Sequence, residues 1–192
     1  HEDMFQNCLA ALKTDDYDFV QCNYKEISLL GVIQDKIVQP EIPTALQRSD
    51  LLKALVGKAF VGNESLIFKG LWNKLWKKSI FIENNFIFPK NNGYEDMFIT
   101  YLYSTYCHRV MLLPDVYYFY RQRENSITGN IKAKNVHDYI YILKLIRKSF
   151  SARVNELGEF DYANEIYRSG LAYCANMAYN KKEAEQALLN EM

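Results

Sequence analysis

The sequence predicts an α/β fold, in an α+β arrangement over this stretch of chain, followed by a region that is entirely helical. Two segments, 17–27 and 109–123, are rich in β-branched and aromatic residues, and the first alternates as a strand does. From about residue 134 onward, apolar residues recur every three or four positions, as they do in helices. This change of period favours a mixed domain at 1–130 and a helical C-terminal subdomain at 131–192.

The first sixty residues predict, in chain order, a helix, a strand, one or two short extended segments and a second helix: 1–16, 17–27, 29–43 and 51–60. Pro40 and Pro43 close the extended segments, because proline has no backbone N–H to donate to a sheet. Ser49 and Asp50 are polar residues of the kind that cap a helix, so we expect the second helix to begin after them.

Turn residues and apolar periodicity assign the later segments as well. We expect an extended piece near Trp72, a helical turn over 77–84, a loop ending at Pro89, a helix from Glu95, two short strands broken at Pro114-Asp115, and a linker over 124–134. The C-terminal region predicts a helix from about residue 134, a stop at Gly158, a second helix over 160–179 and a third over 181–190.

Charge and cysteine content exclude several classes of protein. Lys plus Arg and Asp plus Glu both number 23, so the chain lacks the basic surplus expected of a nucleic-acid-binding protein. No apolar run approaches the roughly 20 residues of a membrane-spanning helix. The four cysteines are scattered without a CxxC pair, which predicts free buried thiols in a reducing, cytoplasmic compartment and no metal site built from cysteine: Cys8, Cys22, Cys107 and Cys174.

Two adjacent carboxylates, Glu95 and Asp96, stand at the head of an apolar helical pattern. They fit helix capping, since acidic residues in a first turn complement the backbone dipole. They also fit catalysis, because an Asp at a helix N-terminus would stay ionised through that dipole and could act as a general base. The residues by themselves leave both interpretations open.

Three stretches in a fixed order carry a resemblance: LWNKLWKKSIF at 71–81, FPKNNGYEDMFITYLY at 88–103 and VYYFYRQRENSIT at 116–128. Together they resemble the C-terminal half of family 2 glycosyltransferases, the inverting enzymes of GT-A fold, over about residues 1–130. The resemblance implies a partial GT-A-like sheet with flanking helices. It also implies hexosyl transfer from a nucleotide sugar to a glycan or lipid-linked acceptor, as in the polysaccharide biosynthesis of cell envelopes.

The same resemblance implies roles for particular residues. Asp96 would be the base that deprotonates the acceptor hydroxyl, and Glu95 would orient the acceptor or cap the helix. Substrate contacts are expected from residues near the acceptor and from an arginine cluster that would face the donor diphosphate: Trp72, Asn73, Lys74, Tyr94, Arg121, Gln122 and Arg123. The competing interpretations are a structural tryptophan and a solvated strand end that pairs with Glu124.

The family's nucleotide-binding half and its cation-binding DxD motif have no counterpart in this sequence. Asp16 and Asp18 follow a helix rather than an apolar strand, so we interpret them as turn and capping residues. A divalent cation, Mg or Mn, is therefore expected only in an intact enzyme, and we expect this chain alone to be inactive.

The alternative is a non-catalytic module that binds a glycan or a protein. Under either hypothesis, absence of the nucleotide half would uncover apolar surface, so a homodimer is expected. Basic residues of the C-terminal helices form either an ordinary solvated face or a peripheral contact with the inner face of the membrane: Lys132, Lys134, Lys144, Arg147, Lys148 and Arg153.

Overall fold

The computed structural model describes residues 1–34, 40–56, 60–61, 64–123, 133–157 and 161–179 of the chain. Its centre is a five-stranded sheet, in which β6 pairs with β1 beside the main strand order β2-β1-β7-β3. The strands of this sheet are β1 (Phe19–Ile27), β2 (Ile33–Gln34), β3 (Thr44–Gln47), β6 (Lys74–Trp76) and β7 (Arg109–Arg121). A separate two-stranded sheet joins β4 (Phe60–Val61) to β5 (Glu64–Ser65). The mixed α/β architecture predicted from the sequence is confirmed.

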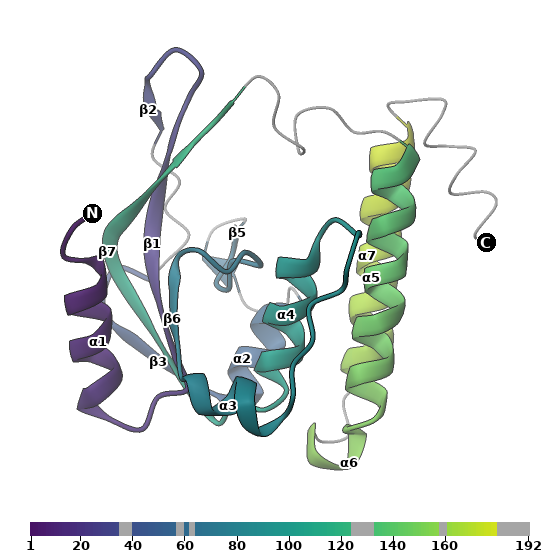
Figure 1. Ribbon diagram of the computed structural model, residues 1–192, viewed down its shortest axis with the longest axis horizontal. Coiled ribbons are helices and arrows are strands. Elements are labelled where there is room, and N and C mark those ends of the chain that lie inside the picture. Colours follow the sequence, from purple (N-terminus) through teal and green to yellow (C-terminus); the bar gives the residue numbers. More distant parts are fainter. Residues whose placement is uncertain (35–39, 57–59, 62–63, 124–132, 158–160, 180–192) are drawn as a thin grey trace.

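Helices cover both faces of the main sheet (Figure 1). Helix α1 (Met4–Thr14) packs on one face, where Met4 and Cys8 meet Val20 and Cys22 of β1. The other face is covered by α2 (Arg48–Leu55) and α4 (Glu95–Ser104), with α3 (Lys78–Glu83) near its lower end. β1 is buried from Phe19 to Tyr24, because its alternate side chains enter two different apolar layers.

The predicted break at Pro114-Asp115 is wrong, because β7 is one strand of thirteen residues. It pairs in parallel with β1 along most of its length, and the register shifts near the proline, between Leu112 and Val116. β3 pairs antiparallel only with the first part of β7, up to Leu112. Proline is therefore tolerated at position 114. At this position β7 has continued past its pairing with β3, and its register with β1 is irregular.

Helix α2 also departs from the predicted bounds. It begins at Arg48, with Gln47 as the N-cap residue, so Ser49 and Asp50 lie inside the first turn. It ends at Leu55, and Phe60 belongs to β4. Asp50 still complements the helix N-terminus from within the first turn, and the N-cap residue Gln47 makes no side-chain capping hydrogen bond.

The first of the C-terminal helices packs directly on α4, and the last packs on the first. These helices are α5 (Ala133–Ser151), α6 (Val154–Leu157) and α7 (Tyr162–Tyr179). Buried residues of α5 and α7, such as Ile140, Ile146 and Ile166, belong to the same apolar cluster as those of α2 and α4. The division of the chain near residue 130 stays a prediction. Most of the expected linker, the stop at Gly158 and the third helix over 181–190 lie outside the described residues.

All four cysteines are buried free thiols, as the sequence predicts. Within the described ranges, no helix is both long and apolar enough to span a membrane.

Candidate active site

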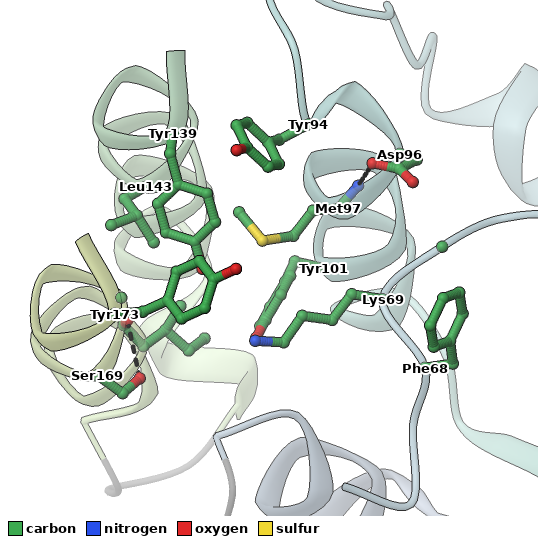
Figure 2. Close-up of a pocket in the computed structure, with 13 residues that line it drawn as sticks. Phe68, Lys69, Tyr94, Asp96, Met97, Tyr101, Tyr139, Leu143, Ser169 and Tyr173 are labelled. Atoms are coloured by element: carbon green, nitrogen blue, oxygen red, sulfur yellow. Dashed lines mark hydrogen bonds between the residues drawn. The ribbon is translucent and has the colours of Figure 1, made fainter. Parts of the chain in front are cut away.

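A cavity of about 560 Å³ opens between α4 and the C-terminal helix pair. One wall comes from the segment around Lys69 and from α4; the other comes from α5 and α7. Figure 2 shows aromatic rings facing the cavity from both walls. The lining tyrosines are Tyr94, Tyr101, Tyr139 and Tyr173. The Tyr139 ring bridges the walls, with its centroid 4.9 Å from that of Tyr94 and 5.2 Å from that of Tyr173.

In the structure the two predicted carboxylates have different surroundings. Asp96 is half-buried at the rim of the cavity, and its Oδ1 accepts a hydrogen bond from the Met97 backbone N–H at 2.7 Å (Figure 2). Glu95 is exposed and does not line the cavity. Burial raises the pKa of Asp96, and the negative charge of Glu95 adds to this shift. The hydrogen bond from the Met97 N–H and the positive charge of Lys74 oppose this shift in the pKa of Asp96.

The turn before α4 is held in an unusual conformation by α5. Tyr94 has left-handed backbone angles, φ 64° and ψ 22°, which are uncommon for a residue with a side chain. The buried Asp138 of α5 accepts a hydrogen bond from the Gly93 N–H at 3.0 Å and forms an ion pair with Lys134 at 2.5 Å. Lys134 also donates to the Asn91 carbonyl oxygen at 3.2 Å. These contacts fix the direction in which α4 presents Asp96.

Lys74 and Asn73 are buried and bonded to protein groups. The Lys74 ammonium donates to the carbonyl oxygens of Phe68 and Gly70, both at 2.7 Å, and to Asn73 Oδ1 at 2.9 Å. Asn73 Nδ2 in turn donates to the Cys22 carbonyl oxygen of β1 at 2.9 Å. Burial lowers the pKa of Lys74, while the nearby charges of Cys22 and Asp96 oppose that shift. The segment from Phe68 to Lys74 is thus folded around a buried amine.

Trp72 lies in an aromatic cluster outside the cavity lining. Its ring stacks on those of Tyr118 and Tyr120, with centroids 4.2 Å and 5.1 Å away, and meets the Tyr24 ring edge-on at 4.9 Å. The side chain is half-buried, so one part of the indole remains accessible. Packing accounts for the position of this residue without a sugar ligand.

The predicted arginine cluster lies at the far end of β7. Arg121 is opposite Ile27 in the β1–β7 register, and Gln122 Nε2 donates to Glu26 Oε2 at 3.3 Å. Arg121 and Arg123 are exposed, and none of the three residues lines the cavity. Since side chains alternate along a strand, Arg121 points away from the face that carries Tyr120. Their contact with a donor diphosphate stays a prediction.

Sequence interpretation missed the residues that complete the cavity. Tyr139 and Tyr173 were assigned only to helices, because periodicity shows that a helix has a buried face but not what it packs against. Lys69 was not singled out either. Its ammonium lies 5.9 Å from the Tyr101 ring centroid, and the surrounding protein lowers its pKa (Figure 2).

Asp16 and Asp18 both contact other protein groups. Asp18 is buried, and its Oδ2 accepts the backbone N–H groups of His108 and Arg109 at 2.6 and 3.2 Å. Asp16 is exposed and pairs with Lys77 at 2.6 Å. In the described part of the chain, no three side chains of His, Cys, Asp or Glu come together as a metal ion would require.

Asp18→Ala is expected to lower the free energy of unfolding by about 2 kcal/mol, because two backbone donors would lose their acceptor in a buried position. The matched change Asp16→Ala removes only a surface ion pair, so no measurable change is expected. Urea unfolding of both variants provides the measurement. Equal losses would show that Asp18 has no special structural role.

Asp96→Asn is expected to raise the free energy of unfolding at pH 7. The raised pKa means that the folded state binds the Asp96 proton more tightly than the unfolded state does. This tighter proton binding stabilises the folded state at pH values below the ordinary Asp pKa. The stabilisation is lost as pH rises through the Asp96 pKa of the folded state. The gain from asparagine should therefore vanish at about pH 3. Urea unfolding at both pH values tests this, and lower stability of Asp96→Asn at pH 7 would identify the carboxylate as a helix cap.

No protein-family model and no curated protein matches the chain. The architecture is nevertheless consistent with a partial GT-A-like fold. A similar solved structure is that of S. aureus TarS, residues 1–349, in complex with UDP-GlcNAc. The two share 14% sequence identity at a TM-score of 0.61, over 89% of this chain and 44% of the TarS chain. The chain thus spans less than half of the TarS chain that it resembles.

Proposed function

We propose that this chain forms the acceptor-side part of an inverting glycosyltransferase. The intact enzyme would transfer a hexosyl group from a nucleotide sugar to a glycan or lipid-linked acceptor. One observation carries the proposal: a half-buried carboxylate, Asp96, stands at the rim of a tyrosine-lined cavity. The fold likeness to TarS, whose structure was solved with UDP-GlcNAc, supports a nucleotide sugar as donor.

In this proposal Asp96 is the general base. The acceptor hydroxyl loses its proton to Asp96 Oδ2, since Oδ1 is occupied by the Met97 N–H. The hydroxyl oxygen then forms a bond to the anomeric carbon as the bond to the nucleoside diphosphate breaks on the opposite face, which inverts the configuration. A pKa raised by burial suits this role, because a base is most effective when its pKa lies nearer the working pH.

The cavity would bind the acceptor through its tyrosines. Tyrosine rings offer an apolar face to the C–H groups of a sugar, and their hydroxyls can exchange hydrogen bonds with sugar hydroxyls. The hydroxyls of Tyr94 and Tyr139 stay neutral at physiological pH, since burial raises the pKa of Tyr94 to about 12 and raises that of Tyr139 as well. Lys74 acts as a positioning residue, because its ammonium fixes the segment beside the cavity.

In this proposal the donor site is formed by residues of the intact enzyme other than those that the structure describes. No metal-binding cluster is found among the described residues, so no step above involves a cation. The divalent cation of the proposed enzyme, Mg or Mn, would be held in the intact protein by groups outside this part of the chain. The expected contact of Arg121, Gln122 and Arg123 with the donor diphosphate stays a prediction and carries no step of this proposal.

Calorimetric titration tests the proposal. UDP and GDP, each with manganese, are titrated into this chain and into a form of the protein extended at its N-terminus. We expect binding by the extended form alone. Binding by the short chain would show that the diphosphate site has been assigned to the wrong residues. If neither form binds, a non-catalytic module that binds a glycan or a protein becomes the better interpretation.

A further inference from the structure

The turn between β1 and β2 exposes four aliphatic side chains in succession around Gly31. Leu30 is 90% exposed, and Leu29, Val32 and Ile33 are between 54% and 59% exposed. Figure 1 shows this hairpin projecting from one end of the molecule, beyond the helices that cover the sheet. We call Leu29, Leu30, Val32 and Ile33 the hairpin tip. Exposed aliphatic side chains grouped in this way usually mark an interaction surface.

Three hydrogen bonds close the backbone turn that carries the hairpin tip. The Gly31 N–H donates to the Ser28 carbonyl oxygen at 2.9 Å, and the Ser28 N–H donates to the Val32 carbonyl oxygen at 2.8 Å. The Val32 N–H donates to Ser28 Oγ at 3.1 Å. Each of these bonds satisfies a backbone group that would cost several kcal/mol if it were left unbonded in a hydrocarbon phase.

Cationic side chains lie just behind the tip. Arg121 pairs in register with Ile27, the last residue of β1, and Arg123 follows two residues later. Both arginines are exposed. The only described carboxylate on this last part of β1, Glu26, accepts a hydrogen bond from Gln122. The strand ends behind the aliphatic tip are therefore net positive, which complements anionic lipid headgroups.

We infer that the hairpin tip inserts into the interface of an anionic membrane, with Arg121 and Arg123 at the level of the lipid phosphates. A bilayer suits the tip better than a protein partner does. A stable protein interface takes roughly 800 Å² from each partner, more than a projecting turn of four aliphatic residues offers. A bilayer accepts a small convex aliphatic group without a matching pocket. This inference does not depend on the proposed function.

Vesicle co-sedimentation of the full chain tests the inference. Vesicles of phosphatidylcholine with phosphatidylglycerol should bind the chain, and Leu29→Ser/Leu30→Ser should weaken that binding about tenfold or more. Ile87→Ser is the matched control, since Ile87 is 74% exposed. The neighbouring residue Phe86 packs on Tyr106, which lies just before the start of β7 at Arg109. The hairpin tip lies beside the opposite end of β7, near Arg121. Absence of vesicle binding by the unchanged chain, or equal binding by the tip and control variants, overturns the inference.

Further variants test the role of the two arginines and distinguish lipid from other possible occupants of the hairpin tip. Arg121→Gln/Arg123→Gln should weaken binding to anionic vesicles by roughly fivefold per charge and leave binding to pure phosphatidylcholine unchanged. Loss of UDP binding in the N-terminally extended form, with unchanged vesicle binding, would place these arginines at the donor site and overturn their contact with lipid. If Leu29→Ser/Leu30→Ser converts a dimer to a monomer in sedimentation velocity, the tip contacts a second copy, not lipid. Leu30→Trp adds an independent measurement: its emission should shift to the blue with anionic vesicles, and an unshifted spectrum contradicts insertion.

Discussion

Asp96→Asn is expected to lower the rate of sugar transfer by a factor of about 10²–10⁴, the usual contribution of a general base. Asparagine keeps an Oδ1 that can accept the Met97 N–H, so the start of α4 should be preserved. The variant loses only the capacity to take the proton from the acceptor hydroxyl. The measurement is the rate of UDP or GDP release in the extended, transfer-competent form of the protein.

Glu95→Gln is the matched control for this prediction, because it makes the same chemical change at the neighbouring, exposed position. Its transfer rate should stay within a few-fold of the unchanged protein, since Glu95 does not line the cavity. Loss of activity in Glu95→Gln alone would move the base to that residue. Full activity in both variants would leave the pair as part of the helix terminus and nothing more.

Lys74→Met is expected to lower the free energy of unfolding by roughly 3 kcal/mol or more. The ammonium donates to three acceptors in a buried position, and methionine would leave all three without a donor. Because two of these acceptors are backbone carbonyls at Phe68 and Gly70, the segment beside Asp96 should also become less ordered. Urea unfolding gives the stability, and hydrogen exchange of amides 68–74 reports the local order.

Lys69→Met provides the control for Lys74→Met, because it is the same substitution in the same segment. The Lys69 ammonium lies over the Tyr101 ring, a contact worth less than about 1 kcal/mol at an accessible site. A similar stability for the two variants would show that the acceptors of Lys74 find other partners. A direct contact between Lys74 and the acceptor, which the family resemblance implies, would then be the better interpretation.

Local signals in the sequence were sufficient to place Asp96. The polar turn at 91–93 and the apolar pattern after Asp96 predict a helix that starts where α4 does, at Glu95. Both signals act within a few residues of the helix start, and the tertiary contact from Asp138 of α5 to the Gly93 N–H is compatible with them. The raised pKa of Asp96 was not predictable, since it results mainly from burial by the folded chain.

Features that depend on distant pairing were not predictable. A proline suggests a strand break, yet β7 continues past Pro114 because β1 supplies its partner and β3 ends at the level of Leu112. Likewise, Tyr94 and Tyr139 are 45 positions apart in the sequence, and only the packing of α5 on α4 brings their rings to 4.9 Å. Helical periodicity identifies such residues as inward-facing without naming the surface that they meet.

Two parts of the chain form the cavity, so the ligand that it binds could change through substitutions in one part alone. Asp96 and Lys74 belong to the sheet and the helices laid on it, whereas Tyr139 and Tyr173 belong to the C-terminal pair. Exchanging Tyr139 and Tyr173 would therefore reshape the site without disturbing the carboxylate or the segment that surrounds the buried amine, as long as Asp138 and Lys134 of α5 still hold the turn before α4. Relatives of this protein could then diverge in the molecules they accept by altering two helices, while the chemistry at the rim is inherited unchanged.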